Sequence, residues 1–144
     1  MSEFKVELPD VFVFHHILPV RINDINYGNH LDFSILAGML HNIRALLLYN
    51  NQLTEGDLDG SSLITKSMVV DYKRPAIFND KLDFYLGKGK NNSPTKFETI
   101  YLVKNKIDDK EIARASITLA FINNITKKPT KTPSILEELF DKSL

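Results

Sequence analysis

The stretch that decides the fold is residues 24–32, DINYGNHLD, which runs directly into the apolar segment 33–49. Within that segment only Ser34, His41, Asn42 and Arg44 are plainly polar. A helix that is apolar on nearly every side cannot lie on a surface, so we expect it to be enclosed by other parts of the protein. Its first turn carries unpaired amide N–H groups and the positive end of the helix dipole, beside a polar cluster. A carbonyl could be polarised there.

Composition restricts the class of protein. The 144 residues are expected to form a single domain over 1–144, and contents of 43% hydrophobic and 25% charged residues are typical of a soluble globular protein. Because 18 basic residues balance 18 acidic ones, neither nucleic acid nor membrane is favoured as a partner. The absence of cysteine excludes disulfides and thiolate chemistry. With no signal-peptide pattern, and with segment 33–49 too short to span a bilayer, we expect a cytoplasmic protein.

Hydrophobic alternation predicts five strands, over 11–22, 63–72, 82–88, 97–104 and 112–122. A short amphipathic helix is expected after Pro133, with Ser134 and Glu137 at the spacing of a capping box. This order predicts an α+β fold in which one antiparallel sheet of consecutive hairpins wraps around one long central helix. Because a single such layer leaves sheet edges uncovered, we expect a homodimer or homotetramer.

Three segments occur in a recognisable order around the expected long helix: RINDINYGNHL at 21–31, MVVDYKRP at 68–75 and DKL at 80–82. Together they resemble the hotdog-fold acyl-CoA thioesterases of the 4-hydroxybenzoyl-CoA thioesterase type. That family carries the signature R-x-x-D-x-D-x-x-G-H-(V/L)-N-N before its helix, and this chain matches it at Arg21, Asp24, His30 and Leu31. The resemblance covers roughly residues 11–122 and implies a hotdog fold and a hydrolase that cleaves thioesters.

The chain departs from the family pattern at several positions. Asn26 stands where most members carry a second Asp, Asn29 stands at the usual Gly, and residues 32–33 read DF rather than NN. A branch of the family also reads D-I-N-Y-G-x-H, so Asn26 is compatible with activity. Other members use a helix carboxylate about a dozen residues after the His, whereas this chain reads HNIR at 41–44. The long helix therefore offers no obvious carboxylate.

Hydrolysis of an acyl-CoA or acyl-carrier-protein thioester needs an aimed water, a proton acceptor and donors for the oxyanion. We expect backbone N–H groups around residues 29–32 to be those donors. Asn26 would orient the water or the carbonyl, and His30 or Asp32 would serve as the base. Asp24 would hold the loop.

The substrate-binding candidates come from the same turn and from the end of a predicted strand: Tyr27, Gly28, Asn29, Leu31, Lys73 and Arg74. The last two could meet the phosphates of coenzyme A, although a solvated strand end explains them equally well.

Each residue of the turn also has an ordinary structural interpretation. Asp24 and Asp32 could simply cap a turn and a helix, and Asn26 could be a turn residue. His30 could be a loop histidine, although a buried polar cluster would favour a function. Gly28 is expected to supply a positive φ angle.

Two other functions compete with hydrolysis. An R-specific enoyl-thioester hydratase would carry D-x-N-P-(L/I)-H, but three residues separate Asn26 from His30 here and the proline is missing. A non-catalytic acyl-thioester binder is the third possibility, because the acidic set is incomplete.

No cofactor or metal is expected. His15 and His16 are adjacent on a predicted strand and so face opposite ways, and His41 is expected to be a core or interface residue. No segment matches a phosphate loop, a nucleophile elbow or a dinucleotide fingerprint.

Overall fold

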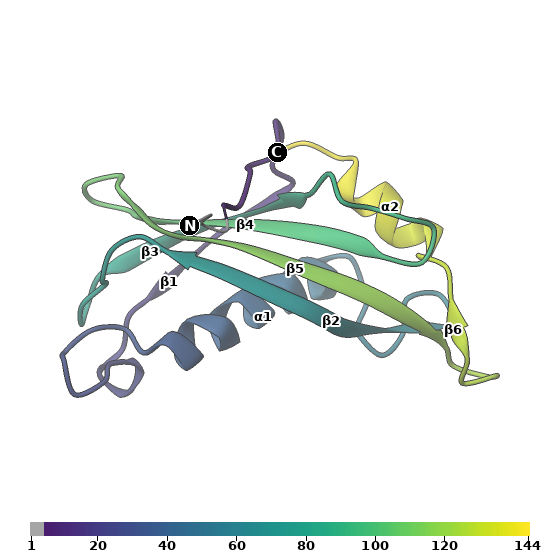
Figure 1. The fold of residues 1–144 in the computed structure, drawn as a ribbon, viewed down its shortest axis with the longest axis horizontal. Helices are drawn as coiled ribbons and strands as arrows, with labels where there is room; N and C mark the ends of the chain where they lie inside the picture. The colour runs from purple at the N-terminus through teal and green to yellow at the C-terminus, as the bar shows by residue number, and fades with distance from the viewer. Residues whose placement is uncertain (1–4) are drawn as a thin grey trace.

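The computed structural model describes residues 5–144 and shows an α+β fold built on one antiparallel sheet. The strand order is β1-β3-β4-β5-β2, and a short β6 pairs with β5. Helix α1 lies along the concave side of the curved sheet (Figure 1). In chain order the elements are β1 (Phe14–Pro19), the 3-10 helix η1 (Ile22–Asp24), α1 (Phe33–Asn50), β2 (Ser61–Tyr72), β3 (Lys81–Lys88), β4 (Phe97–Asn105), β5 (Glu111–Asn123), β6 (Pro129–Thr130) and α2 (Ser134–Phe140).

The predicted strands after the long helix are confirmed to within two residues at each end. Their alternation holds in detail, because every second residue of β5 from Ala113 to Phe121 is at most 1% exposed. Opposite this row, Tyr101 of β4 pairs with Ala115 and Thr99 pairs with Ile117. Side chains of one phase therefore form the core that faces α1. The sequence pattern does not predict the short strand β6.

The first strand is shorter than predicted. It covers Phe14–Pro19 rather than residues 11–22, and it pairs only with β3, from Phe14 opposite Leu86 to Pro19 opposite Lys81. Pro19 ends the strand because proline has no N–H to donate to a ladder. As an edge strand, β1 tolerates that proline, as expected.

Within the single chain, helix α1 is enclosed on one side only, so the expected enclosure on nearly every side is not met by this chain alone. Leu36, Leu40 and Ile43 are fully buried, each with 0% exposure. On the opposite face, residues such as Gly38 and His41 are exposed or partly exposed. The sheet covers one side of the helix, and the polar residues noted in the sequence lie mainly on the other side. The apolar face alone supplies the packing that holds α1, at about 1.5–3 kcal/mol for each buried leucine or isoleucine.

A second helix, α2, packs at one end of the sheet. Its Phe140 ring meets Phe97 of β4 edge to face, with ring centroids 5.0 Å apart. The predicted capping box is not formed: the N-cap is Pro133, and no side chain caps the helix. Burial of Leu136, Leu139 and Phe140 in the core cluster therefore holds this short helix in place.

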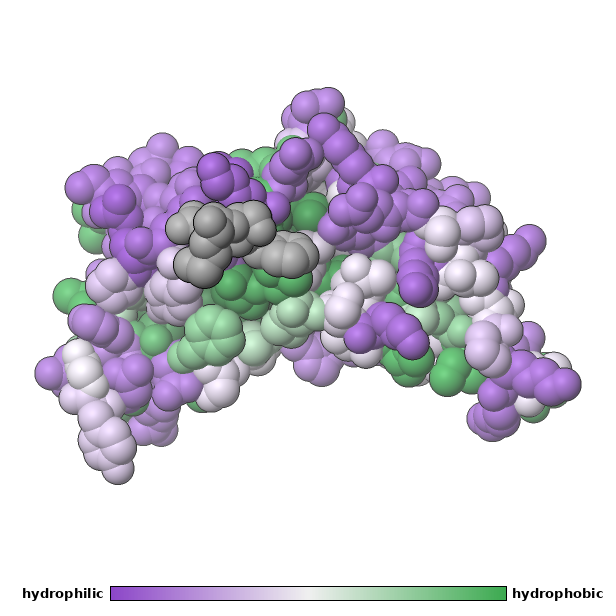
Figure 2. Space-filling view, viewed as in Figure 1, coloured by the Kyte–Doolittle hydropathy of each residue, from purple (hydrophilic) through white to green (hydrophobic). Residues whose placement is uncertain are grey.

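Hydrophobic residues gather across the middle of one face of the molecule, with hydrophilic residues at both ends (Figure 2). Among the helices of residues 5–144, none has the length and apolarity needed to cross a membrane.

Candidate active site at the start of helix α1

The loop between η1 and α1 closes on itself as a tight turn. Ile25 and Leu31 form an isolated β-bridge, and the N–H of Asn26 donates to the carbonyl of His30 at 2.8 Å. The positive φ angle that the turn requires, 62°, falls on Asn29. The expectation that Gly28 supplies it is therefore wrong. Asparagine takes this role because its short polar side chain tolerates the left-handed region.

The side chain of Asn26 organises this turn. Its Oδ1 accepts the N–H of Gly28 at 3.0 Å and, more weakly, the N–H of His30 at 3.4 Å. Its amide nitrogen Nδ2 has no hydrogen-bond partner in residues 5–144. Because the oxygen is fixed by the backbone, that amide group remains the one polar group of the Asn26 side chain free to donate to a ligand.

Asp24 holds the loop in place through both its side chain and its backbone. It is 1% exposed, and its carboxylate accepts hydrogen bonds from the Arg21 backbone N–H at 2.8 Å, from Nε at 3.2 Å and from Nη2 at 3.0 Å. Burial alone would raise the pKa of Asp24, but the hydrogen bonds and charge of Arg21 together hold that pKa below its usual value. The backbone carbonyl of Asp24 also accepts the N–H of Asp32 at 2.8 Å. Through these contacts Asp24 positions the loop before α1.

Asp32 is the N-cap of α1, as predicted. Its Oδ1 accepts the backbone N–H of Ser34 at 2.9 Å and the Ser34 hydroxyl at 2.6 Å. The hydroxyl hydrogen bond, followed by the backbone one, holds the pKa of Asp32 below its usual value. A carboxylate stabilised in this way is a weaker proton acceptor, so His30 is the better base of the two.

The expected oxyanion donors are largely occupied within the turn. The N–H groups of Asn29, Leu31 and Asp32 donate to the carbonyls of Asn26, Ala76 and Asp24, at 3.0, 2.8 and 2.8 Å. The expectation that N–H groups across residues 29–32 are available is wrong for these three. Within residues 5–144 the N–H of Phe33, the first helical residue, has no acceptor. It is the free donor at the helix start.

The turn is open to solvent rather than buried. Residues 26–30 are all exposed, and Tyr27 is fully so. The prediction of a buried polar cluster around His30 is therefore wrong for this chain, because the sheet does not extend over the turn. Leu31 is the opposite case: it is 2% exposed and belongs to the core cluster. A packing role replaces the substrate contact predicted for it.

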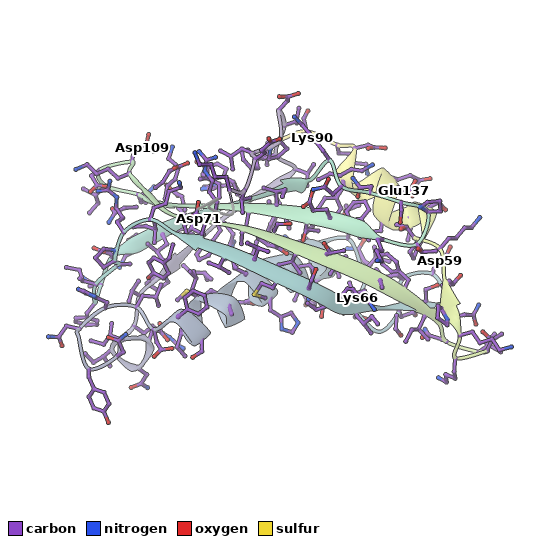
Figure 3. The ribbon with its side chains drawn as sticks, viewed as in Figure 1. Asp59, Lys66, Asp71, Lys90, Asp109 and Glu137 are labelled. Atoms are coloured by element: carbon purple, nitrogen blue, oxygen red, sulfur yellow. The ribbon has the colours of Figure 1, made fainter. Side chains whose placement is uncertain are left out.

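Lys73 and Arg74 follow the end of β2. The Lys73 ammonium lies 3.3 Å from Asp71, which Figure 3 labels on β2, and Arg74 Nε donates to the Glu111 carbonyl at 3.1 Å. The turn reaches this segment through the hydrogen bond from Leu31 to Ala76. Both cations are exposed and lie in the chain segment that borders the turn.

A second polar cluster is not indicated by the sequence. Glu55, in the loop after α1, accepts hydrogen bonds from His41 Nε2 at 2.7 Å and from Arg44 Nε at 2.6 Å. His41, expected to be a core or interface residue, is exposed on its helix, so it is not a core residue, and a place in an interface stays a prediction. Helical spacing places His41 beside Arg44, but it gives no indication that a loop carboxylate returns to them.

Comparison with known proteins agrees with this architecture. Residues 20–140 match the sequence profile of a family described as the thioesterase-like superfamily. The 1,4-dihydroxy-2-naphthoyl-CoA thioesterase from Synechocystis has a similar structure, with a TM-score of 0.78 and 18% identity over 89% of this chain and 95% of that one. A hypothetical protein from Staphylococcus aureus, solved in complex with CoA, has a TM-score of 0.78 and 12% identity over 98% and 90%. The probable thioesterase YbaW from Escherichia coli has a TM-score of 0.74 and 18% identity over 87% and 94%. No curated protein sequence matches the chain significantly.

Proposed function

The chain belongs to the thioesterase-like superfamily, and on that premise we propose that it hydrolyses the thioester of an acyl-CoA to a free acid and a thiol. The observation that supports this most directly is the presence of two free donors in the segment around the start of α1: the Asn26 amide and the Phe33 N–H. Donors of this kind stabilise the negative charge that develops on a carbonyl oxygen under attack.

In the proposed mechanism the thioester carbonyl binds at the start of α1. Its oxygen accepts from Phe33 N–H and from Asn26 Nδ2, and the helix dipole favours the developing charge. Asp24 and Asp32 serve by fixing the loop and the first helical turn. Their own carboxylates are engaged by Arg21 and Ser34 and take no proton.

His30 is the proposed base. A water molecule gives a proton to its imidazole while the water oxygen bonds to the carbonyl carbon. Collapse of the tetrahedral intermediate breaks the carbon–sulfur bond and releases the thiolate, which takes the proton from His30. His30 is exposed in the turn, so its ring is reachable by water and substrate.

Coenzyme A is the proposed thiol carrier rather than acyl-carrier protein. Three structural neighbours are named with CoA, two as thioesterases of a CoA thioester and one as a complex with CoA. Lys73 and Arg74 would bind the phosphates. Tyr27, Gly28 and Asn29 would contact the pantetheine arm along the exposed turn.

A non-catalytic acyl-CoA binder is the second candidate. The observation that favours it is that the carboxylates of Asp24 and Asp32 are both engaged in hydrogen bonds. Of the candidate bases in the turn, this leaves only His30. Such a protein would bind acyl-CoA without releasing thiol.

We also propose that the protein works as a homo-oligomer. β2 is an edge strand, and its Ile64 and Met68 are 42% and 40% exposed. An edge with apolar residues is a surface that natural proteins cover. Sedimentation velocity should give a species of at least twice the chain mass of 16.4 kDa, and Met68→Lys should shift it toward the monomer. A wild-type protein that sediments as a monomer at high concentration would contradict this.

The catalytic proposal is tested by thiol release from a panel of acyl-CoA thioesters. We expect Asn26→Ala and His30→Ala each to lower kcat by about a hundredfold or more, which is the range for a lost oxyanion donor or general base. His16→Ala, which alters a histidine on β1, is the matched control and should leave kcat unchanged. Unaltered thiol release in both Asn26 and His30 variants would overturn the assignment, and acyl-CoA binding without thiol release would favour the binder.

A further inference from the structure

Tyr72 is the last residue of strand β2, which ends at the same end of the molecule as the start of helix α1 (Figure 1). Its ring stacks on that of Phe33, the first residue of the helix, with ring centroids 6.2 Å apart and ring planes inclined by 28°. Its hydroxyl lies 3.4 Å from the carbonyl oxygen of Leu31, a long and weak hydrogen bond in which the phenol donates. Tyr72 therefore contacts the residues on both sides of the N-cap of α1.

The side chain of Tyr72 is suited to act as a fixed donor. It is partly buried and packs against the hydrophobic core cluster, which restricts its rotation. Burial raises the pKa of the Tyr72 phenol above its usual value, and the charge of Asp32 acts in the same direction. The hydroxyl is therefore protonated at neutral pH and can donate to the Leu31 carbonyl.

The peptide group before the free donor of the site is held at both of its ends. This group joins Leu31 to Asp32. Its carbonyl oxygen accepts from the Tyr72 hydroxyl, and its N–H donates to the Asp24 carbonyl at 2.8 Å. Because a peptide group is planar, contacts at its two ends fix the orientation of the whole group. That orientation sets the direction in which the chain enters α1.

The peptide group after the free donor is held by the helix cap. Its N–H, that of Ser34, donates to the Asp32 carboxylate at 2.9 Å. The Phe33 side chain is 56% exposed, so contact with the Tyr72 ring, rather than burial in the core, holds it in place. The peptide group between these two held groups carries the Phe33 N–H, which is thereby aimed in a fixed direction.

We propose that Tyr72 is a positioning residue for the carbonyl site at the start of α1, and that its hydroxyl and its ring together fix the direction of the Phe33 N–H. The proposal rests on the proposed function, which makes that N–H an oxyanion donor. Such a donor stabilises the developing charge only when it points at the oxygen. Loss of the Tyr72 side chain should therefore weaken recognition of the carbonyl oxygen and leave binding of the rest of the ligand intact.

The test uses two kinds of CoA analogue that cannot release a thiol. In the ketone analogue a methylene group replaces the thioester sulfur, and in the plain analogue a second methylene group also replaces the carbonyl. Both kinds are made in an octanoyl and a benzoyl series, and their dissociation constants are measured by calorimetry. Wild type should bind the ketone about tenfold more tightly than the plain analogue, as one net hydrogen bond allows.

Variants of Tyr72 should lower this carbonyl preference in a set order. Tyr72→Leu should reduce it to about twofold and leave the affinity for the plain analogue within about twofold, which also shows that the variant is folded. Tyr72→Phe keeps the ring and loses the hydroxyl, so it should retain an intermediate preference. In thiol-release assays the same order should appear in kcat, with KM changed by less than about threefold.

A variant that lacks the donor shows whether Tyr72 acts through it. Phe33→Pro removes the N–H, and proline suits the first position of a helix. Asp32 already has φ −68° and ψ 138°, the extended backbone that a residue before proline adopts. In this background Tyr72→Leu should have no further effect on the preference. Phe33→Leu, which keeps the N–H, should retain more of the preference than Phe33→Pro.

A second aromatic pair provides the matched control. The ring centroid of Tyr85 on β3 lies 5.5 Å from that of Phe12, and Tyr85 is opposite in phase to the core residue Phe84. Tyr85→Leu should lower the urea midpoint without changing the carbonyl preference.

Two results would overturn the proposal: an unchanged preference in Tyr72→Leu, or an equal loss of preference when Tyr72→Leu is added to Phe33→Pro. Because the analogues are inert, a protein that shows the preference but releases no thiol would reject only the proposed hydrolysis. A wild type without preference in either series would reject the Phe33 donor itself, together with this role of Tyr72.

Discussion

Arg21 and Asp24 form an asymmetric pair: the side chain of Arg21 is 72% exposed, whereas that of Asp24 is 1% exposed. The guanidinium thus reaches from solvent to a buried carboxylate that supports the turn before α1. Removing the Arg21 side chain leaves this carboxylate buried with the Arg21 backbone N–H as its remaining donor.

Arg21→Ala should lower the free energy of unfolding, because a buried charged acceptor loses two of its three donors. Urea denaturation followed by circular dichroism measures this. The control is Lys104→Ala, which removes an ion pair to Asp109, 75% exposed, and should cost at most about 1 kcal/mol. The Arg21 variant should show the larger loss of the two. Equal effects of the two substitutions would contradict the anchoring role of Asp24.

Acid should destabilise the protein through its three stabilised carboxylates. The pKa values of Asp24, Asp32 and Glu55 are lowered in the folded chain. The unfolded chain therefore binds protons first, and the stability that these groups provide is fully present above their unfolded pKa values of about 4. That stability is lost as pH falls through the lower folded values. Urea midpoints measured between pH 7 and pH 3 should fall mainly below about pH 5, and Glu55→Gln should weaken this dependence.

Asp32→Ser separates capping from catalysis. Serine caps a helix about as well as aspartate, so the substitution should leave the urea midpoint close to that of wild type, whereas Asp32→Ala should lower it. If Asp32 only caps α1, the Ser variant should keep most of its thiol release. A loss of kcat in Asp32→Ser comparable with that in His30→Ala would identify Asp32 as the base instead.

Two glycines should respond oppositely to alanine. Gly38 lies inside α1 and has no atom within 4 Å of the place a Cβ would take, so Gly38→Ala should raise stability by about 0.5–1 kcal/mol. At Gly89 a Cβ would collide with the carboxylate of Glu98, which is 7% exposed and bonded to Ser116 and Asn91. Gly89→Ala should therefore cost about 1–3 kcal/mol. Thermal or urea unfolding of both variants checks the difference in sign.

Local sequence patterns are enough to predict the sheet and the start of the long helix. The alternation from Ala113 to Phe121 follows directly from the two-residue repeat of a strand, and Asp32 lies at the cap because its side chain accepts from Ser34. The same patterns place the positive φ angle on Gly28 rather than Asn29, because both residue types suit such a turn and only the closed hydrogen bonds decide between them.

The remaining errors concern positions that depend on distant parts of the chain. The exposure of His30 depends on where the sheet ends, which no pattern within the turn encodes. The contacts of Glu55 cannot be predicted from local sequence patterns, because its partners His41 and Arg44 lie 14 and 11 residues earlier in the chain. The end of helix α1 and part of a loop separate them from Glu55. Helix α1 contains no carboxylate of its own, and the fold brings the Glu55 carboxylate to it from the loop that follows.

That carboxylate comes from the loop that follows α1, while the imidazole and the guanidinium that it bonds belong to the helix. The same loop carries Leu58, which is fully buried in the core. Replacing residues 51–60 as a whole would therefore leave Arg44, whose side chain is 5% exposed, without its carboxylate and would remove a core residue, so the loop is part of the folded unit rather than a neutral connection.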